Sequence, residues 1–229
     1  MQRLAHAFIL AALLLAGCRG SDTAPSPAPV ASVPAKATEP APEPSDSRPL
    51  IVCFGDSLTA GYGAEAHQSY PDHLQADLDA AGYSYHVRNE GVSGATSKDG
   101  VARLPAIVAL HPAIVVVEFG GNDGLRGLST DDLSRNLDTM ISTLKIAQIQ
   151  VVLAGISLPP DYGPDYIQRF TAIYPTLAKK HHVPLLPFLL KDVFGVPGMM
   201  QADRTHATAE GNEIVAKNIL AVLQPLLKK

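Results

Sequence analysis

From residue 50 onward, short apolar runs alternate with longer amphipathic segments, and this alternation restricts the fold more than any other feature of the sequence. Several of the runs are rich in Val and Ile, which is typical of strands that are buried on both faces. The five apolar runs span residues 50–54, 85–88, 113–119, 150–156 and 184–188. The five segments with a helical spacing of apolar residues span residues 70–81, 97–110, 130–147, 165–181 and 207–227.

Strands that alternate with helices predict an α/β domain of three layers, in which a five-stranded parallel sheet lies between two layers of helices. Pro105 and Pro175 fall inside two of the predicted helices, and we expect them to kink or split these helices. In folds of this class, substrates bind beyond the carboxyl ends of the strands. The loops that follow the strands are therefore where a functional site is expected.

The beginning of the chain has a different character. Residues 1–17 resemble a secretory signal, because Arg3 precedes an apolar run that is too short to remain as a membrane-spanning helix. The signal ends in the sequence LAGC, which is similar to the lipobox of bacterial lipoproteins, in which cleavage before the cysteine is followed by acylation of its sulfur. This resemblance implies that Cys18 is lipidated. The alternative is a plain signal peptide with an incidental cysteine.

Residues 18–49 are predicted to form a disordered tether between the lipid and a folded domain at 50–229. Eight prolines lie among Ala, Ser, Thr and acidic residues in this segment, and large apolar residues are almost absent. We therefore expect an exported lipoprotein on the periplasmic side of a bacterial membrane, anchored through its N-terminal lipid. Arg19 stands where many inner-membrane lipoproteins carry aspartate, so by analogy the outer membrane is the expected destination.

Composition excludes some classes of partner and bond. The chain is 46% hydrophobic and carries a net charge of −4 with 18 Lys and Arg, so it can bury a core but presents no basic surface for nucleic acid. We expect a monomer. Cys18 is assigned to the anchor, so Cys53 has no partner for an intramolecular disulfide and is predicted to be a small core residue.

Small and polar residues follow the predicted strands. Ser57 lies in a GDSL sequence directly after the first strand, a GGND sequence follows the third, and Asp203 and His206 precede the last helix. A serine hydroxyl becomes a nucleophile when a histidine takes its proton, and an aspartate can hold that histidine in the required tautomer. The sequence therefore predicts the parts of a hydrolase. The alternative for Ser57 is an ordinary N-cap of a helix.

These blocks, in this order and spacing, resemble the GDSL or SGNH hydrolase family, and most closely its bacterial thioesterase I/arylesterase/lysophospholipase group. The resemblance covers 50–229 and implies a flavodoxin-like fold with Ser57, Asp203 and His206 as the catalytic triad. It further implies an oxyanion hole formed by the backbone N–H groups of Ser57 and Gly94 and the side-chain amide of Asn122. The chain departs from the family near His206, since Arg204 replaces a glycine and no proline follows the histidine. We expect this loop to be stiffer or differently placed.

The resemblance implies hydrolysis of acyl esters or thioesters, with a small acyl ester or a lipid as substrate and an acyl-enzyme as intermediate. An acyl groove is predicted from four apolar loop residues: Leu125, Leu128, Leu158 and Pro159. Two alternatives remain, namely a carbohydrate or peptidoglycan O-acetylesterase and a tethered binding protein with an inactive site. We expect no cofactor and no metal, because the sequence has no cluster of His, Asp or Glu with ligand spacing beyond Asp203 and His206.

Three further residues near these motifs have expected roles in shaping loops. Asp56 and Asp123 each stand beside a predicted catalytic residue, and we expect each to orient its loop. Gly91 is expected to serve a turn in the loop that spans residues 89–97.

Overall fold

A computed structural model describes residues 46–229, so the predicted signal, Cys18 and nearly all of the predicted tether lie outside the described residues. The described part contains one five-stranded sheet with the order β2-β1-β3-β4-β5, and every neighbouring pair is parallel. The strands are β1 (Leu50–Gly55), β2 (His86–Gly91), β3 (Ile114–Glu118), β4 (Gln150–Ala154) and β5 (Leu185–Leu186). The predicted α/β class is confirmed.

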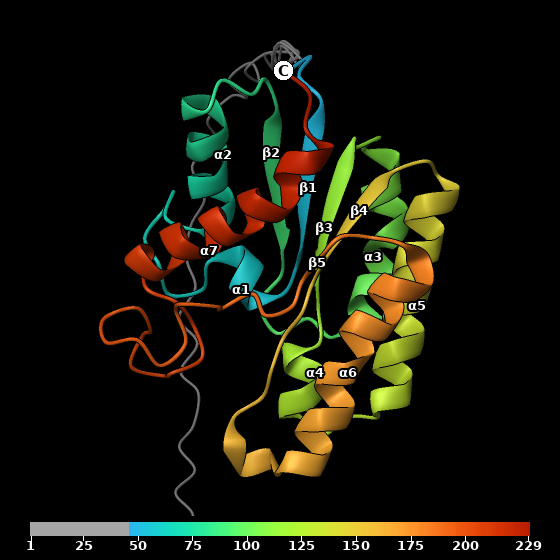
Figure 1. The fold of residues 1–229 in the computed structure, drawn as a ribbon, viewed down its shortest axis with the longest axis vertical. Coiled ribbons are helices and arrows are strands. Elements are labelled where there is room, and N and C mark those ends of the chain that lie inside the picture. The colour runs from blue at the N-terminus through green and yellow to red at the C-terminus, as the bar shows by residue number, and fades with distance from the viewer. Residues whose placement is uncertain (1–45) are drawn as a thin grey trace, which may run out of the picture. The chain divides into compact units, whose positions relative to one another are not determined.

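Helices cover both faces of this sheet. They are α1 (Ser57–Ala60), α2 (Tyr70–Ala80), α3 (Ser97–Ala109), α4 (Gly121–Leu125), α5 (Thr130–Ile146), α6 (Pro164–His181) and α7 (Ala209–Leu223). Figure 1 shows α2 and α7 packed together on one face and α3, α5 and α6 on the other. The chain steps from β1 to β2 in one direction along the sheet and from β2 through β5 in the other. Crossovers of one handedness therefore place the helices on opposite faces.

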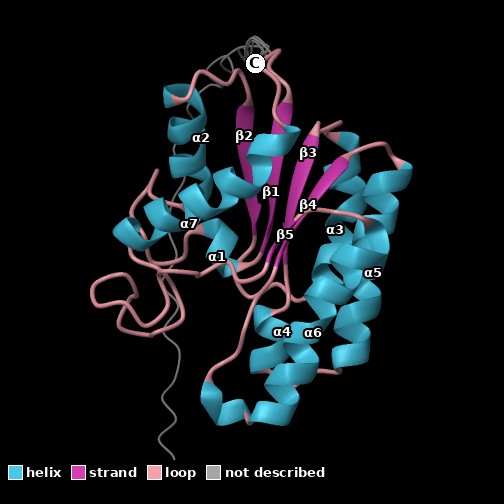
Figure 2. Cartoon of the chain, in the orientation of Figure 1, coloured by secondary structure: helices cyan, strands magenta, loops and turns pink. Residues whose placement is uncertain are grey.

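The core lies along the central strands. Ile51, Val52, Cys53 and Phe54 of β1 are all fully buried, as are Val115, Val116 and Val117 of β3. Cys53 is thus a core residue, as predicted, and burial raises the pKa of its thiol to about 12. Because β1 and β3 are covered on both faces and end at the same edge, the residues after them are held on a rigid base (Figure 2).

The helices that contain Pro105 and Pro175 are not split. Helix α3 continues through Pro105, and α6 continues through Pro175. A proline removes one N–H from a helix, but α3 buries Leu104 and Ile107 on either side of Pro105, and this packing holds the helix together. Proline does act as a stop at the end of α7, which gives way to a 3-10 turn at Gln224–Leu226.

Three elements differ from the sequence expectation at the carboxyl edge of the sheet. Strand β2 extends to Gly91, so residues 89–91 are paired strand and the loop begins at Val92. Gly91 therefore does not form a turn, and it is small for another reason: a Cβ there would lie 2.2 Å from the backbone nitrogen of Ala60. The short helices α1 and α4 were not predicted, because one helical turn leaves no periodic pattern.

Candidate active site

Ser57 is the first residue of α1, immediately beyond the end of β1. The N-cap of this helix is Asp56, whose Oδ1 accepts a hydrogen bond from the backbone N–H of Leu58 at 3.0 Å. Gly61 closes the helix in the left-handed conformation, with φ of 76°. Because Asp56 takes the capping position, the Ser57 hydroxyl is left for another partner, and the N-cap interpretation of Ser57 is wrong.

That partner is His206. The Ser57 Oγ lies 2.8 Å from Nε2 of His206, although the two residues are 149 positions apart in the chain. The opposite ring nitrogen, Nδ1, lies 2.7 Å from Oδ2 of Asp203. Hydroxyl, imidazole and carboxylate thus form one continuous line of hydrogen bonds, which is the arrangement needed to transfer a proton from the serine during attack.

The turn that holds Asp203 and His206 is fixed by its own backbone. Oδ1 of Asp203 accepts hydrogen bonds from the N–H groups of Thr205 and His206, at 2.9 Å and 3.1 Å. Burial alone would raise the pKa of Asp203, but the hydrogen bonds from His206 and Thr205 hold it below its usual range. Asp203 is therefore ionised at neutral pH and can stabilise a positively charged imidazole.

Arg204 adopts a conformation that usually requires glycine. Its φ is 56°, in the left-handed region, where a Cβ costs about 1–2 kcal/mol. Two backbone hydrogen bonds hold the loop: the N–H of Arg204 donates to the carbonyl of Gln201, and the N–H of Gln201 donates to that of His206. The expected difference in placement from the family stays a prediction. Across the loop, the ring of Tyr62 packs against His206 with centroids 4.8 Å apart.

Two backbone N–H groups are available beside the serine. Neither Ser57 nor Gly94 donates its N–H to any acceptor within residues 46–229. Gly94 has a φ of 81° in the turn closed by the hydrogen bond from Ala95 N–H to the carbonyl of Val92, a conformation that glycine adopts without strain. Its carbonyl is held by Arg126, whose Nη2 lies 2.9 Å away.

Asn122 is already engaged within the protein. Its Nδ2 donates to Oδ2 of Asp56 at 3.1 Å and to the carbonyl of Ala95 at 3.0 Å. Its Oδ1 lies 3.5 Å from Nη2 of Arg126. Asn122 therefore connects the loop after β1, the loop after β2 and α4. Both hydrogens of its amide are already donated within the protein, so the amide can bind an oxyanion only if one of these hydrogen bonds is shared or broken.

Asp56 and Asp123 both orient loops, as expected. Asp123 is buried, and Oδ2 accepts from the N–H of Ser97 at 2.8 Å, which ties α4 to the start of α3. Asp56 is also buried and contacts a second acid, Glu118, at the end of β3. Burial raises the pKa values of both Asp56 and Glu118, and the increase is larger for Glu118.

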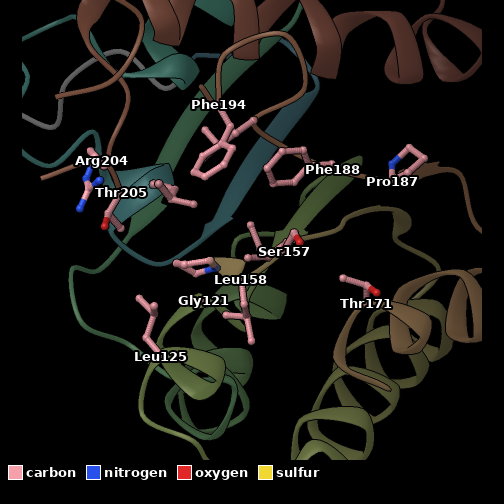
Figure 3. A pocket seen from close by; sticks show the side chains of 14 residues that line it. Gly121, Leu125, Ser157, Leu158, Thr171, Pro187, Phe188, Phe194, Arg204 and Thr205 are labelled. Atoms are coloured by element: carbon pink, nitrogen blue, oxygen red, sulfur yellow. The ribbon is translucent and has the colours of Figure 1, made fainter. Parts of the chain in front are cut away.

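An apolar cavity of about 360 Å³ opens next to the triad. Figure 3 shows Phe188 and Phe194 across from Leu125, with Arg204 and Thr205 at one edge. Leu125, Leu158 and Pro159, three of the four residues predicted to form an acyl groove, line it. Leu128 does not line it. The chain turns at Gly127, where φ is 63°, and the Leu128 carbonyl accepts a hydrogen bond from the Tyr166 hydroxyl.

Several residues of the candidate site were not predicted from the sequence. Phe188 lies beyond the end of the short β5, and Phe194 follows in a segment without regular structure, so no periodic pattern marked either as part of a site. Arg126 and Glu118 stand next to motifs that were recognised, and their proximity to GGND is the one signal that could have identified them. Gly94, which accepts a hydrogen bond from Arg126, and Asp56, which donates one to Glu118, are distant from them in sequence.

Two other kinds of feature are absent from residues 46–229. That part of the chain holds no group of three or more His, Cys, Asp or Glu placed to bind a metal ion. Of the helices just described, none is both long enough and apolar enough to cross a membrane.

Comparison with known proteins gives consistent matches to ester hydrolases. Residues 53–214 match the model of the GDSL-like lipase/acylhydrolase family. The chain is 43% identical over 178 residues to the esterase TesA of Pseudomonas aeruginosa, covering 77% of this chain and 89% of the relative. It is 40% identical over 178 residues to thioesterase 1/protease 1/lysophospholipase L1 of Escherichia coli, covering 77% and 84%. A crystal structure of TesA superposes with a TM-score of 0.75 at 42% identity, covering 78% of this chain and 99% of that one.

Proposed function

The chain belongs to the GDSL-like lipase/acylhydrolase family, and we propose that it is a carboxylic ester hydrolase in which Ser57 is the nucleophile, His206 the general base and Asp203 the residue that orients the imidazole. Similar relatives are named as an esterase, as a thioesterase and lysophospholipase, and as an arylesterase. The separations of 2.8 Å and 2.7 Å along the line from Ser57 to Asp203 support these roles.

Acylation begins when Ser57 Oγ attacks the carbonyl carbon of the ester and its proton passes to Nε2 of His206. The ionised Asp203 stabilises the imidazolium that forms. His206 then gives the proton to the departing alcohol or thiol, which leaves Ser57 acylated. In the second half of the reaction, His206 takes a proton from water, the hydroxide attacks the acyl carbonyl, and Ser57 recovers its proton when the acid is released.

The oxyanion of each tetrahedral intermediate requires hydrogen-bond donors. The N–H groups of Ser57 and Gly94 suit this role because neither has an acceptor in the described part of the chain. Asn122 contributes by redirecting one hydrogen of its amide from the carbonyl of Ala95 to the oxyanion. Donors of this kind typically stabilise a transition state by about 2.7–4 kcal/mol each.

The apolar cavity is the single observation that carries the choice of substrate. It is lined by Leu58, Ile156, Leu158, Phe188 and Phe194 among others, and within residues 46–229 Arg204 is the one charged residue that lines it. Each methylene buried against such a surface contributes about 0.8 kcal/mol. An O-acetylesterase would have no use for this surface, so the site favours esters with a longer acyl chain over carbohydrate or peptidoglycan acetate.

A chain-length series tests this proposal. We expect kcat/KM for p-nitrophenyl esters to increase from acetyl to at least octanoyl, and Ser57→Ala to abolish hydrolysis and labelling by a fluorophosphonate while the protein stays folded. A preference for acetate, with good activity on acetylated sugars, would favour the alternative function. Substantial activity in Ser57→Ala would refute the mechanism.

The location of the enzyme is a separate part of the proposal. The LAGC sequence that ends at Cys18 supports a lipoprotein held on the periplasmic side of the outer membrane by a lipid on Cys18. Residues 18–49 then act as the tether, and 50–229 form the hydrolase domain. We expect Cys18→Ala to disappear from the lipoprotein fraction. A protein truncated to begin at Arg48 should keep nearly unchanged turnover on soluble esters, and its inactivity in a folded state would contradict the domain division.

A further inference from the structure

Glu118 is a buried carboxyl group that the steps above do not use. It is the last residue of β3, it is 0% exposed, and it pairs in register with Gly55 of β1. A Cβ at Gly55 would lie 2.4 Å from Oε2 of Glu118. Gly55 has no side chain, and the Glu118 carboxyl group therefore fits beside the segment that carries Asp56 and Ser57.

Glu118 contacts the segment that carries the nucleophile at several points. Its Oε2 accepts a hydrogen bond from Thr59 Oγ1 at 2.8 Å and from the backbone N–H of Asp56 at 3.2 Å. Its Oε1 faces no hydrogen-bond donor within residues 46–229. Burial, and after it the negative charge of Asp56, raises the pKa of the Glu118 carboxyl group well above its usual range.

Within residues 46–229, no cation contacts Glu118. Asp56, Tyr70 and Tyr174 are the titratable groups that act on Glu118 or respond to it, and none of them carries a positive charge. Burial raises the pKa of Asp56, and the basic group His206 opposes this increase, which favours a negative charge on Asp56 rather than on Glu118. Two adjacent buried carboxylates without a cation are costly, so such pairs keep one proton.

The contacts of Asp56 place the negative charge on Asp56 and the proton on Glu118. Asp56 Oδ1 accepts from the N–H of Leu58 and Oδ2 accepts from the amide of Asn122, and both hydrogen bonds favour its carboxylate form. Glu118 has one satisfied oxygen and one without a donor. A proton on Glu118 removes the negative charge from a buried carboxyl group whose second oxygen no donor reaches.

We propose that Glu118 is a positioning residue that stays protonated while the enzyme works and holds Asp56 in place through the backbone N–H of Asp56, so that the Asp56 carboxylate can orient the Ser57 helix turn and the Asn122 amide. The inference rests on the proposed function, because it takes Ser57 as the nucleophile. Ionisation of Glu118 would place a second charge beside Asp56 and loosen both of these contacts.

Matched amide substitutions in the full-length protein test where the proton lies. Glu118→Gln is uncharged like the protonated acid and keeps an oxygen that can accept from Thr59 and from the backbone N–H of Asp56, so we expect kcat on p-nitrophenyl acetate to stay within about threefold of the wild type. Asp56→Asn cannot accept from both Leu58 and Asn122, and we expect kcat to fall about a hundredfold or more. The reverse order would place the proton on Asp56 and overturn the proposal.

Two further measurements separate positioning from a purely structural role. Glu118→Ala should lower kcat at least about tenfold with little change in KM, whereas Val117→Ala, a buried truncation on the same strand, should lower stability and leave kcat nearly unchanged. At alkaline pH the wild type should lose kcat as Glu118 ionises, and Glu118→Gln should lack this loss. Equal kcat values for Glu118→Ala and Val117→Ala, or the same alkaline loss in Glu118→Gln, would overturn the proposal.

Infrared spectroscopy tests the proton without any assay of activity. At neutral pH, the wild type should show a C=O stretching band of a protonated carboxylic acid that disappears in Glu118→Gln. If Glu118→Ala fails to fold, this band and the amide pair still decide the proposal. Absence of the band refutes protonation of Glu118 whether or not Ser57 is the nucleophile, so the two proposals can fail separately.

Discussion

Replacement of Glu118 by Gln should change how the stability of the protein depends on pH. A carboxyl group that keeps its proton in the folded state, at a pH where the unfolded chain releases it, makes the folded state lose stability as pH rises. Burial raises the pKa of Glu118 well above its usual range, so this condition applies from about pH 5 upward. Glutamine carries no such proton, and the loss is absent in the variant.

The size of the effect follows from one proton. While Glu118 is protonated in the folded state and ionised in the unfolded state, the free energy of unfolding falls by about 1.4 kcal/mol per pH unit. Between pH 5 and pH 7, Glu118→Gln should therefore gain about 2.7 kcal/mol relative to the wild type. Because the pKa of Glu118 is higher in the folded state than in the unfolded state, its contribution to stability is complete at pH values below the unfolded-state pKa and is lost as pH increases.

Urea unfolding followed by circular dichroism at several pH values measures this difference, since the chain contains no Trp for a fluorescence assay. Glu65→Gln, on an exposed residue, is the control for the loss of one acidic group. When the wild-type free energies of unfolding are subtracted from those of the variant at each pH, the contributions of groups that titrate alike in both proteins cancel. A difference that stays flat with pH, or one that decreases, would refute the assignment of a proton to Glu118.

Three other changes have expected outcomes. Asn122→Ala should lose two to three orders of magnitude in kcat, and an unchanged rate would remove Asn122 from the oxyanion hole. Phe194→Ser should reduce kcat/KM about tenfold more for a decanoyl than for an acetyl ester, because Phe194 lines the cavity. Equal losses for the two esters would show that the acyl chain does not bind in this cavity. Gly55→Ala should lower the free energy of unfolding by at least about 1–3 kcal/mol, because its methyl group would lie 2.1 Å from Thr59 Oγ1 and 2.7 Å from the carbonyl oxygen of Glu118. A urea midpoint of unfolding equal to that of the wild type would contradict this.

The fold class was readable from the sequence because the pattern is local. Runs of Val and Ile such as 114–117 have no polar side chain to face solvent, so a strand there must be covered on both sides. Helices between such strands then require a parallel sheet. The limits of this reasoning lie at the carboxyl edge, where β2 continues to Gly91 and α1 and α4 are single turns, because hydrogen bonds to neighbouring segments decide these boundaries.

For the candidate site, the sequence determined the residue types and tertiary structure decided their pairing. Ser57, Asn122 and His206 were identified by their motifs and by their place after predicted strands. The distance of 2.8 Å from Ser57 to His206 depends on the sheet and on the path of the chain to the last loop. No local pattern encodes that separation.

The roles of Glu118 and Asp56 show the same division most clearly. In the sequence, Glu118 is an acidic residue at the end of an apolar run, and no neighbouring residue in the chain indicates why an acid stands there. Only the register of β1 against β3 places it opposite Gly55 and in contact with Asp56, 62 residues away. Burial and the meeting of two carboxyl groups then set its protonation, and both arise from the packing of segments that are distant in the chain.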